Sequence, residues 1–592
     1  MDELKNRLSP EAFNNLEKWL NEPQYSDFRE EINKLISNKD FEELEDAFYT
    51  HIQIGTGGIR GKVGSGPNRI NLQTIGEAAQ GLANFIKDFG EELKAKGVIV
   101  GYEARKMSLP FAQLCCSVFA ANGIKAYLFN SLRSTPEVSF AVRFLKTAAG
   151  VQITASHNPR ADNGFKFYWS DGGQVVPPLD LKFMEQVKKV DSIKTTDFSS
   201  ALEKGLIQMV GNEVDEPYLT AIRGLSLTKT RSAKIVFSPM HGAGVNNVLP
   251  VLKAEGFEVV VVPEQASPDE KFPTAPNGLV DPEYPQVMSL AVALGEKIAA
   301  DLVVNSDPDA DRIGVASKVT HDSNKVQFLN GDQVGVVLAS FVLEQLKLQN
   351  KLSRDSLVVE TYETTNLISD IAAGYGVKVI DDLLVGFKFI GEVIGKLEDK
   401  NDFVFAAEES LGYLRSSFVR DKDAAIAALT LAELTSFLKD QGKTLVNYLD
   451  EIYQKYSYYK NILNMVEMQG RVGFENRAKI MLSLRTKPPL EIAGLKVLKT
   501  IDRLPAEQRR AENYVCGATG DQITFILSED EKTKVTARPS GTEPKIKYYI
   551  QHQQKVAGDL SQTKNQVDSL AKRIEEEMLN LQERVLHATN RH

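Results

Sequence analysis

Short apolar runs alternate with amphipathic stretches along most of the chain, a pattern that predicts an α/β protein. The first 50 residues are helical in pattern, and Ser9-Pro10-Glu11 is a typical helix start because proline suits the first helical position. We interpret this segment as a packing arm without chemistry. The elements expected next are an amphipathic helix over Asn71–Gly97, a strand over Val98–Gly101, a helix over Leu109–Asn122, a strand over Ala126–Phe129, a further helical stretch, and a strand that ends before Ser156.

The same alternation occurs twice more, although no close sequence repeat accompanies it. The second round places strands at Lys234–Phe237, Phe257–Val262 and Asp301–Val304. The third round places a helix from Gln333 to Leu346 and strands at Ser356–Glu360, Val377–Ile380 and Asp402–Phe405. The architecture is therefore expected to repeat three times.

The segment from about Lys460 differs, with a few strands around ARPSGTEPKIKYYI followed by a long helix. One face of that helix is apolar because apolar residues recur at spacings of three and four. These residues are Val567, Leu570, Ile574, Met578, Leu581 and Val585. We expect this stripe to pack against the sheet of the same domain; the alternative is a helix that binds a partner.

These patterns predict an α/β fold made of three related α/β domains with mixed, mostly parallel sheets, plus a smaller C-terminal α+β domain. The length of 592 residues suggests about four domains at the usual size of ~100–200 residues each. The expected domains are residues 1–225, 226–330, 331–460 and 461–592.

The composition is typical of a globular protein, with 42% hydrophobic and 25% charged residues. The net charge of −9 argues against a nucleic-acid-binding surface, so an anionic ligand would need locally gathered cations and backbone N–H groups. No apolar run is long enough to span a membrane, and the charged N-terminus MDELKNRLSPEAF is unlike a signal peptide, which together favour the cytoplasm. Cys115, Cys116 and Cys516 lack metal-site spacing and are interpreted as reduced, mostly buried thiols.

The stretch Ala149–Lys166 presents a serine hydroxyl where a buried strand gives way to a polar loop. Ser156 is followed by His157, and Lys166 lies beyond an expected turn at Asn163-Gly164, so a hydroxyl, an imidazole and an ammonium could converge on one anion. We interpret Ser156 as a nucleophile that carries a phosphoryl group, although serine needs a base or a metal to become reactive. An ordinary polar turn is the alternative.

The strongest motif, DPDADR, directly follows the expected strand that ends at Val304. Asp307, Asp309 and Asp311 occupy alternate positions in a tight loop and can turn toward one point, and oxygen-only ligation suits Mg²⁺ above other cations. A calcium loop is excluded because Arg312 stands where glycine is required and Lys318 where glutamate is required. A solvated acidic turn is the alternative.

Three further stretches have the chemistry of anion or sugar binding. The glycine-rich stretch Gly55–Gly61 matches neither the dinucleotide fingerprint nor the P-loop, but as a loop bearing Arg60 it could meet phosphate oxygens. Arg538–Pro544, followed by Lys547, combines hydroxyls, glycine and cations in a possible phosphate cradle. Glu408-Glu409-Ser410 suits vicinal sugar hydroxyls. The alternatives are a plain turn for the first stretch, a capped loop for the second and an exposed acidic loop for the third. Such loops at the carboxyl ends of strands could surround a single cleft.

These motifs, in this order, resemble those of the α-D-phosphohexomutase superfamily over nearly the whole chain. TASHNP at Thr154–Pro159 is similar to the family's phosphoserine loop, DPDADR to its metal loop, EESLG at Glu408–Gly412 to its sugar loop, and RPSGTEP at Arg538–Pro544 to its phosphate loop. In length and in the TEPKIKYY stretch, the chain is most similar to the long branch that contains phosphoglucomutases and phosphopentomutases. The resemblance implies four domains around a central cleft.

The resemblance also implies a role for each matching residue. Ser156 would be phosphorylated, and His157, Lys166 and Arg60 would assist proton transfer and charge stabilisation. Mg²⁺ would be held by phosphorylated Ser156, Asp307, Asp309 and Asp311. The residues that would bind the substrate are Arg312, Gly386, Lys388, Glu408, Ser410, Lys422, Arg538, Ser540, Gly541, Thr542 and Lys547. Ala407 and Val385 depart from the family's common glycine and threonine near the sugar-recognition elements, which leaves the sugar open.

The activity that the resemblance implies is interconversion of α-D-glucose 1-phosphate and glucose 6-phosphate through a phosphoserine enzyme, with glucose 1,6-bisphosphate as intermediate and primer. Phosphomannomutase and phosphopentomutase activities by the same mechanism are alternatives. A non-catalytic sugar-phosphate sensor and a simple phosphatase are less favoured functions for the same residues. The expected partners are small sugar phosphates, with neither nucleic acid nor membrane, and the chain is expected to be a monomer or a homodimer.

Overall fold

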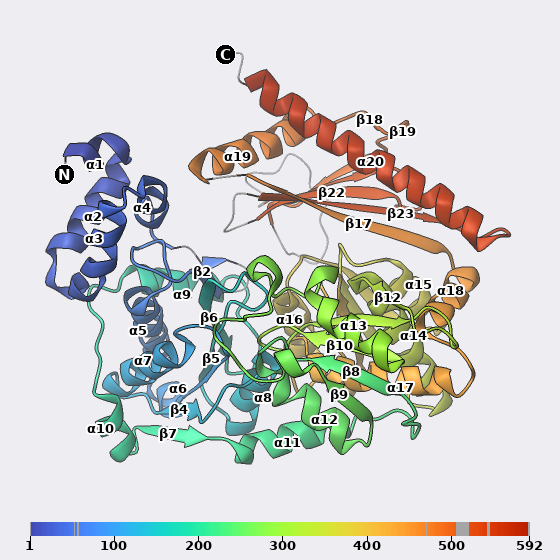
Figure 1. The fold of residues 1–592 in the computed structure, drawn as a ribbon, viewed down its shortest axis with the longest axis horizontal. Helices are drawn as coiled ribbons and strands as arrows, with labels where there is room; N and C mark the ends of the chain where they lie inside the picture. The colour runs from blue at the N-terminus through green and yellow to red at the C-terminus, as the bar shows by residue number, and fades with distance from the viewer. Residues whose placement is uncertain are drawn as a thin grey trace. The chain divides into compact units, whose positions relative to one another are not determined.

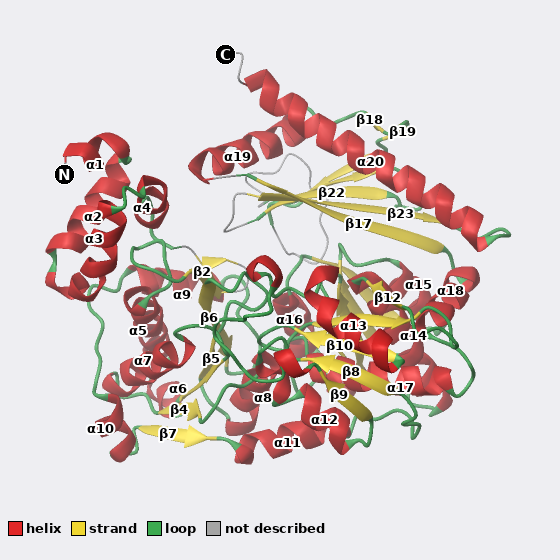
Figure 2. Cartoon of the chain, in the orientation of Figure 1, coloured by secondary structure: helices red, strands yellow, loops and turns green. Residues whose placement is uncertain are grey.

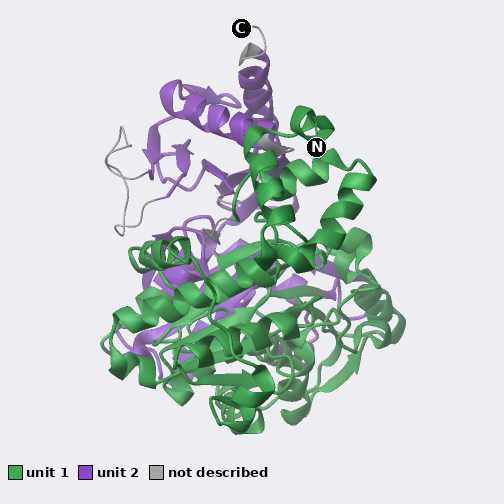
Figure 3. Cartoon of the chain, turned by 90° about the vertical axis from the view of Figure 1, so that its left-hand side faces the viewer, with its two compact units in different colours: residues 1–316, 391–398, 416–433 green, residues 317–390, 399–415, 434–592 purple. Residues whose placement is uncertain are grey.

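The protein is described by a computed structural model that covers residues 2–52, 54–55, 58–468, 470–504, 520–540 and 545–589 (Figure 1). The chain forms two compact units, coloured green and purple in Figure 3. The N-terminal unit comprises Met1–Ala316, Gly391–Glu398 and Ser416–Glu433, and the C-terminal unit comprises Ser317–Ile390, Asp399–Arg415 and Leu434–His592. Helices and strands alternate through most of both units, which confirms the predicted α/β class (Figure 2).

The N-terminal arm consists of four helices, α1 (Asp2–Arg7), α2 (Pro10–Asn21), α3 (Arg29–Ser37) and α4 (Phe41–Phe48). Helix α2 begins as predicted: the Ser9 hydroxyl accepts a hydrogen bond from the backbone N–H of Ala12, and Pro10 occupies the first turn. The four helices enclose their own apolar core around Trp19.

A seven-stranded sheet follows, with strand order β1-β2-β6-β5-β3-β4-β7. Its strands are β1 (Ile54–Gly55), β2 (Gly58–Lys62), β3 (Val98–Tyr102), β4 (Ala126–Phe129), β5 (Ala149–Ile153), β6 (Asp162–Trp169) and β7 (Ile207–Val210). The four strands from β5 to β7 are parallel, whereas β6, β2 and β1 extend the sheet in antiparallel pairs. The sheet is therefore mixed, as predicted.

Helices connect and cover these strands. They are α5 (Leu72–Asp88), α6 (Glu91–Ala95), α7 (Ser108–Ala121), α8 (Thr135–Leu145), α9 (Leu179–Lys188), α10 (Phe198–Glu203) and α11 (Asn212–Arg223). The single helix predicted over residues 71–97 is wrong in one respect: it is divided into α5 and α6 at Gly90, whose φ of 96° is outside the helical range. Cys115 and Cys116 are buried free thiols on α7, as predicted, and Cys516 lies outside the described residues.

The second sheet of the N-terminal unit contains the parallel strands β10 (Leu302–Ser306), β8 (Lys234–Ser238) and β9 (Glu258–Val261), with β11 (Ile313–Lys318) next to β10. Helices α12 (Val248–Ala254) and α13 (Ser289–Ile298) belong to the same region. Strands β5 and β10 are fully buried, and each ends just before one of the two strongest motifs.

In the C-terminal unit, a four-stranded sheet has the order β14-β13-β15-β16 and is parallel except at β16. Its strands are β13 (Leu357–Thr361), β14 (Lys378–Leu383), β15 (Phe403–Glu408) and β16 (Gly412–Leu414); β12 (Val326–Leu329) precedes them in the chain. The helices of this part of the chain are α14 (Gly331–Leu348), α15 (Leu367–Gly374), α16 (Phe387–Lys396), α17 (Ala424–Lys439) and α18 (Leu445–Lys455). Helices α16 and α17 contribute residues to both units.

The last sheet is antiparallel, with strand order β17-β23-β22-β21-β20. Its strands are β17 (Tyr458–Glu467), β20 (Lys499–Asp502), β21 (Ile523–Ile526), β22 (Lys534–Pro539) and β23 (Lys545–Gln554), and a small hairpin pairs β18 (Glu491–Ile492) with β19 (Leu495–Lys496). Helix α19 (Gly470–Thr486) and the long helix α20 (Leu560–Thr589) lie against this sheet (Figure 1). Ile574 and Met578 on α20 share a core with strand residues such as Phe525, which confirms that the predicted stripe packs on its own domain.

Candidate active site

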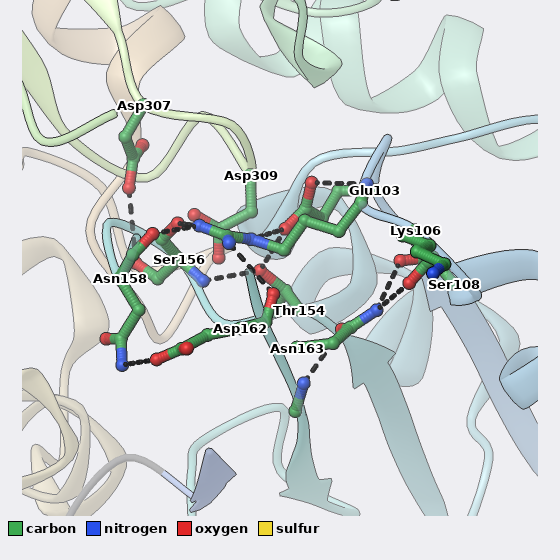
Figure 4. A network of polar contacts seen from close by, with 12 residues as sticks. Glu103, Lys106, Ser108, Thr154, Ser156, Asn158, Asp162, Asn163, Asp307 and Asp309 are labelled. Carbon is green, nitrogen blue, oxygen red and sulfur yellow. Dashed lines mark hydrogen bonds and ion pairs between the residues drawn. The ribbon is translucent and has the colours of Figure 1, made fainter. Parts of the chain in front are cut away.

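Ser156 lies in a tight loop directly after β5 and is 1% exposed. Its φ of 53° puts a non-glycine residue in the left-handed region, a conformation that usually marks a functional constraint. Its backbone N–H donates to the hydroxyl of Thr154 at 2.7 Å, and its own Oγ donates to Oδ2 of Asp307 at 3.1 Å (Figure 4). The predicted nucleophile is therefore held beside the predicted metal loop.

The acidic loop follows β10 as the sequence predicts. Oxygen atoms of Asp307, Asp309 and Asp311 all lie within 4.8 Å of one another, and each side chain is at most 1% exposed. The loop turns tightly because Oδ1 of Asp307 accepts the backbone N–H groups of Asp311 at 3.1 Å and Arg312 at 3.0 Å. Burial and convergence exclude the alternative of a solvated acidic turn.

Two ammonium groups neutralise this loop. Lys166 on β6 is 1% exposed, and its Nζ donates to Oδ2 of Asp309 at 2.7 Å and to Oδ2 of Asp311 at 3.0 Å. Nζ of Lys422 lies 3.0 Å from the same oxygen of Asp311. Oδ2 of Asp309 also accepts a hydrogen bond from the hydroxyl of Thr135 at 2.6 Å. The structure thus joins four segments that are far apart in the sequence.

The three carboxyls do not share one protonation state. Burial and the neighbouring charges of Asp309 and Asp311 hold the pKa of Asp307 well above its usual range. Burial acts in the same direction on Asp309 and Asp311, but the positive charge of Lys166, the hydrogen bonds that Asp309 accepts, and the charges of Lys422 and Arg312 near Asp311 together lower the pKa of both below the usual value. Lys166 therefore favours the ionised form of Asp309 and Asp311, and Lys422 favours that of Asp311.

The loop also fits a hard divalent cation. Within the part of the chain that the structure describes, Oδ1 of Asp309 and Oδ1 of Asp311 are buried without a hydrogen-bond partner. A buried carboxylate oxygen that makes no hydrogen bond is costly unless a ligand completes it. Three converging carboxylates beside a serine hydroxyl supply the oxygen ligands that Mg²⁺ prefers.

His157 belongs to the serine loop itself, and Arg60 approaches this loop from β2. Nδ1 of His157 lies 2.6 Å from Oδ2 of Asp281, a contact that fixes the orientation of the ring. Nη1 of Arg60 donates to Oδ1 of Asn158 at 3.4 Å. The guanidinium of Arg312 pairs with Glu283 at 3.0 Å. The candidate residues predicted in the N-terminal unit therefore lie in or next to the cluster around Ser156 and the acidic loop.

Two local predictions in this region are wrong. Arg60 lies on strand β2 and not in a loop, and Asn163-Gly164 lies inside strand β6 and not in a turn. The physical reason is close approach of backbones, because a Cβ on Gly164 would collide with the carbonyl oxygens of Ile59 and Thr154. Gly58 faces a similar collision with the carbonyl of Phe165. These glycines let β2, β6 and the serine loop approach closely.

The remaining candidate residues belong to the C-terminal unit. Glu408 is the last residue of β15, and its Oε1 accepts the backbone N–H of Gly386 at 2.8 Å. Lys388 is on α16 and Ser410 follows β15. The structure therefore brings the two predicted sugar-recognition segments together.

The predicted phosphate cradle is partly described. Arg538 on β22 is paired in register with Lys547 on β23, so Arg538 lies in a strand and not in a loop as predicted. The backbone N–H of Ser540 donates to the carbonyl of Lys545 at 2.9 Å. Burial alone would lower the pKa of Arg538, but the charges of Tyr549, Glu363 and Glu409 raise it above the usual value. Gly541 and Thr542 lie outside the described residues.

Sequence reasoning missed several residues that support the site. Glu103 and Arg105 follow β3 at the same sheet edge as Ser156, so the rule that singled out Ser156 could have found this charged pair. Thr135 and Asp281 carry no comparable signal, because neither directly follows a buried strand. Their partners lie more than a hundred residues away in the chain.

Comparisons with known proteins agree on one family. Sequence models of phosphoglucomutase/phosphomannomutase α/β/α domains I, II and III match residues 51–194, 216–320 and 330–456. A phosphoglucomutase of Staphylococcus aureus (strain N315) is 34% identical over 517 residues, which are 86% of this chain and 91% of that protein.

Solved structures show the same fold. A phosphoglucomutase/phosphomannomutase family protein from Burkholderia thailandensis has a TM-score of 0.62 at 15% identity, covering 90% of this chain and 98% of its own. The open form of parafusin, a phosphoglucomutase from Paramecium, has a TM-score of 0.64 at 18% identity, covering 90% of this chain and 96% of its own. Among the described residues, no helix combines the length and apolarity needed to cross a membrane.

Proposed function

Because the chain belongs to the phosphoglucomutase/phosphomannomutase family and is a phosphosugar mutase, we propose that it interconverts α-D-glucose 1-phosphate and glucose 6-phosphate. The reaction proceeds through phosphorylated Ser156 and glucose 1,6-bisphosphate, which also primes the dephosphorylated enzyme. The observation that carries the proposal is the buried hydroxyl of Ser156, 3.1 Å from Asp307 within a cluster of carboxylates and ammonium groups. Such a cluster can bear the charge of a phosphoryl group.

In the forward half-reaction, the free hydroxyl oxygen of the bound sugar monophosphate attacks the phosphorus on Ser156. The bond between phosphorus and Oγ breaks, and the attacking hydroxyl loses its proton. With Nδ1 of His157 donating to Asp281, Nε2 is the ring nitrogen that would take a proton from a sugar hydroxyl. Oγ leaves with the bonding electrons; in the second half-reaction it attacks the phosphorus of the other phosphate, the bond from that phosphorus to the sugar oxygen breaks, and the released sugar oxygen takes the proton back.

Arg60 and Lys166 stabilise the charge that develops on the transferred group. Their cationic groups enter the cluster from the neighbouring strands β2 and β6. Mg²⁺ held by phosphorylated Ser156, Asp307, Asp309 and Asp311 would supply further positive charge to the phosphoryl oxygens. Lys422 and Arg312 complete the cationic lining.

The remaining roles concern the part of the sugar phosphate that does not react. Glu408, Ser410, Gly386 and Lys388 bind the sugar hydroxyls. The phosphate that stays in place is bound by Arg538, Ser540, Gly541, Thr542 and Lys547.

The enzyme is cytoplasmic and is a monomer or a homodimer. Its four domains span residues 1–225, 226–330, 331–460 and 461–592. Mannose and pentose phosphates are the competing substrates because Ala407 and Val385 depart from the family pattern.

The decisive test compares Ser156→Ala with Ser117→Ala, a matched change at another buried serine on α7. Ser156→Ala should lower kcat at least ~10³-fold because the nucleophile is gone, and Ser117→Ala should leave kcat within about twofold. Mass spectrometry of the wild-type protein should locate a phosphate on Ser156. Substantial turnover by Ser156→Ala would contradict the proposal.

The substrate is tested separately by kcat/KM for glucose 1-phosphate, mannose 1-phosphate and ribose 1-phosphate, with Mg²⁺ and a bisphosphate primer present. A clear lead for glucose supports the proposal. A lead for mannose or ribose would keep the mechanism and change the substrate. Release of inorganic phosphate at the rate of sugar turnover would instead indicate a phosphatase, and binding without turnover would indicate a sensor.

A further inference from the structure

The serine loop is held from behind by one buried guanidinium. Nη2 of Arg105 donates to the carbonyl oxygens of Ser156 and Asn158, both at 2.5 Å. Nη1 of Arg105 donates to the carbonyl oxygens of Pro159 at 2.7 Å and Asp162 at 2.9 Å. A single side chain therefore binds four backbone carbonyls of the loop that carries the nucleophile.

Arg105 is itself fixed in place. Its side chain has no exposed surface, and its Nε lies 2.6 Å from Oε1 of Glu103, which is also fully buried. The backbone N–H of Arg105 donates to the other oxygen of Glu103 at 3.1 Å. The side chain of Asn163 on β6 donates to the carbonyl of Lys106 and to the hydroxyl of Ser108, both at 2.9 Å, and so ties the same segment to the sheet (Figure 4).

A second connection reaches Ser156 from the same glutamate. The hydroxyl of Thr154 donates to Oε1 of Glu103 at 3.0 Å and accepts the backbone N–H of Ser156 at 2.7 Å. Figure 4 shows Glu103, Thr154 and Ser156 joined by these contacts. Arg105 thus holds the carbonyl of Ser156 while Thr154 holds its N–H, and the two contacts together fix both sides of a residue whose φ is 53°.

We propose that Arg105, Thr154 and Glu103 are positioning residues that hold Ser156 in its left-handed conformation, so that Oγ occupies one place in both halves of the mutase cycle. This inference rests on the proposed function. Oγ must release a phosphoryl group in one half-reaction and take one up in the other, and no part of this network touches the reacting atoms. Phosphoryl transfer depends on placement, and an error of about 1 Å can cost ~10²-fold in rate.

The test uses two substitutions of different severity in the full-length protein. Arg105→Lys keeps the charge but replaces a planar fork with one ammonium, which cannot reach four carbonyls. Thr154→Val keeps the shape but removes the hydroxyl, and Thr154→Ser restores it. Arg231→Lys is the matched control, because Arg231 also binds loop carbonyls, those of Thr228, Thr230 and Glu255, and contacts no predicted site residue.

Thr154→Val and Arg105→Lys should each lower kcat by ~10–100-fold while KM for glucose 1-phosphate changes less than about threefold. Rapid-quench measurement should show the same loss in the rate at which phosphorylated Ser156 transfers its phosphoryl group to the sugar. Thr154→Ser should recover kcat to within about threefold of wild type, and Arg231→Lys should leave kcat within about twofold.

The inference is overturned if Thr154→Val transfers its phosphoryl group at the wild-type rate, or if Arg231→Lys loses as much kcat as Arg105→Lys. Should Arg105→Lys fail to fold, the Thr154 pair decides the question alone. Failure of the proposed function appears differently: the wild-type protein would then carry no transferable phosphate on Ser156.

Discussion

Replacing Lys166 with methionine tests whether the ammonium group compensates the buried acidic loop. The side chain is 1% exposed and bonds to Asp309 and Asp311, neither of which has access to water. Methionine keeps the apolar stem but leaves Asp309 without its ion-pair partner. Breaking a buried ion pair by removing one partner costs about 3–5 kcal/mol, because the remaining charge is uncompensated.

The expected shift in melting temperature follows from this cost. At an unfolding entropy of about 2.1 cal/mol/K per residue, a unit of about 340 residues shifts by roughly 1.4 °C per kcal/mol, so Lys166→Met should lower the Tm of the N-terminal unit by ~4–7 °C in chelator. Mg²⁺ should reduce the difference in Tm between Lys166→Met and wild type by more than half, because the cation would supply the missing positive charge to the same two carboxylates. Lys182→Met on α9, where the lysine is exposed, is the matched control and should change stability by less than ~0.5 kcal/mol.

Differential scanning calorimetry of the three proteins, with EDTA and with saturating Mg²⁺, measures both effects. A Tm for Lys166→Met within about 1 °C of wild type in EDTA, equivalent to less than ~1 kcal/mol, would refute the charge argument. A Tm difference between Lys166→Met and wild type that is the same in EDTA and in Mg²⁺ would show that Oδ1 of Asp309 and Oδ1 of Asp311 do not bind the cation.

Three further predictions follow from the structure. Because the pKa of Asp307 is well above its usual range in the metal-free protein, Mg²⁺ binding should release protons, and the affinity for Mg²⁺ should rise with pH. Calorimetric titration in buffers of different ionisation enthalpy detects the proton release. Binding heats that do not depend on the buffer would contradict this prediction. Burial raises the pKa of Asp423, which accepts the hydroxyl of Tyr218, from 3.8 to about 6. The protonated carboxyl of Asp423 therefore contributes its full stability below pH 3.8, and this contribution is lost as the pH rises through 6. The free energy of unfolding of Asp423→Asn should rise relative to wild type by up to ~3 kcal/mol between pH 4 and 7. A difference in Tm that does not depend on pH would count against this prediction. Ile574→Ala on α20 should cost about 2–5 kcal/mol in thermal unfolding, whereas Arg573→Ala on the exposed side should cost almost nothing; equal effects would mean that the stripe does not face the core.

The sequence predicts strands and strand ends well because buried strands leave continuous apolar runs. Leu302–Val304 is such a run, Ala149–Ile153 is apolar apart from Gln152, and the polar loops that follow them contain the residues that converge. Parallel strands bring their carboxyl ends to one edge, so the amino-acid sequence is enough to single out Ser156 and the aspartates. The interpretation of glycines as turn or loop residues is wrong around Arg60 and at Gly164. There the glycines allow neighbouring strands to pack closely.

Partnerships across long sequence separations could not be predicted from the sequence. Lys422 reaches Asp311, and His157 reaches Asp281, because tertiary packing brings these segments together. No local periodicity encodes such contacts. The fully buried Arg105 shows the limit most clearly, since a lone arginine in a polar loop is usually exposed and only the structure reveals the four carbonyls it binds.

The charge of the site links serine phosphorylation to metal binding. The buried aspartates of the cluster pair with two ammonium groups, from Lys166 and Lys422. Phosphorylation of Ser156 would add about −1.5 to −2 charges only 3.1 Å from Asp307, in a place that water does not reach. A divalent cation offsets almost the whole of that addition, whereas further ionisation of Asp307 opposes it. Phosphorylation should therefore raise the affinity for Mg²⁺, and by reciprocity Mg²⁺ should favour the phosphorylated serine.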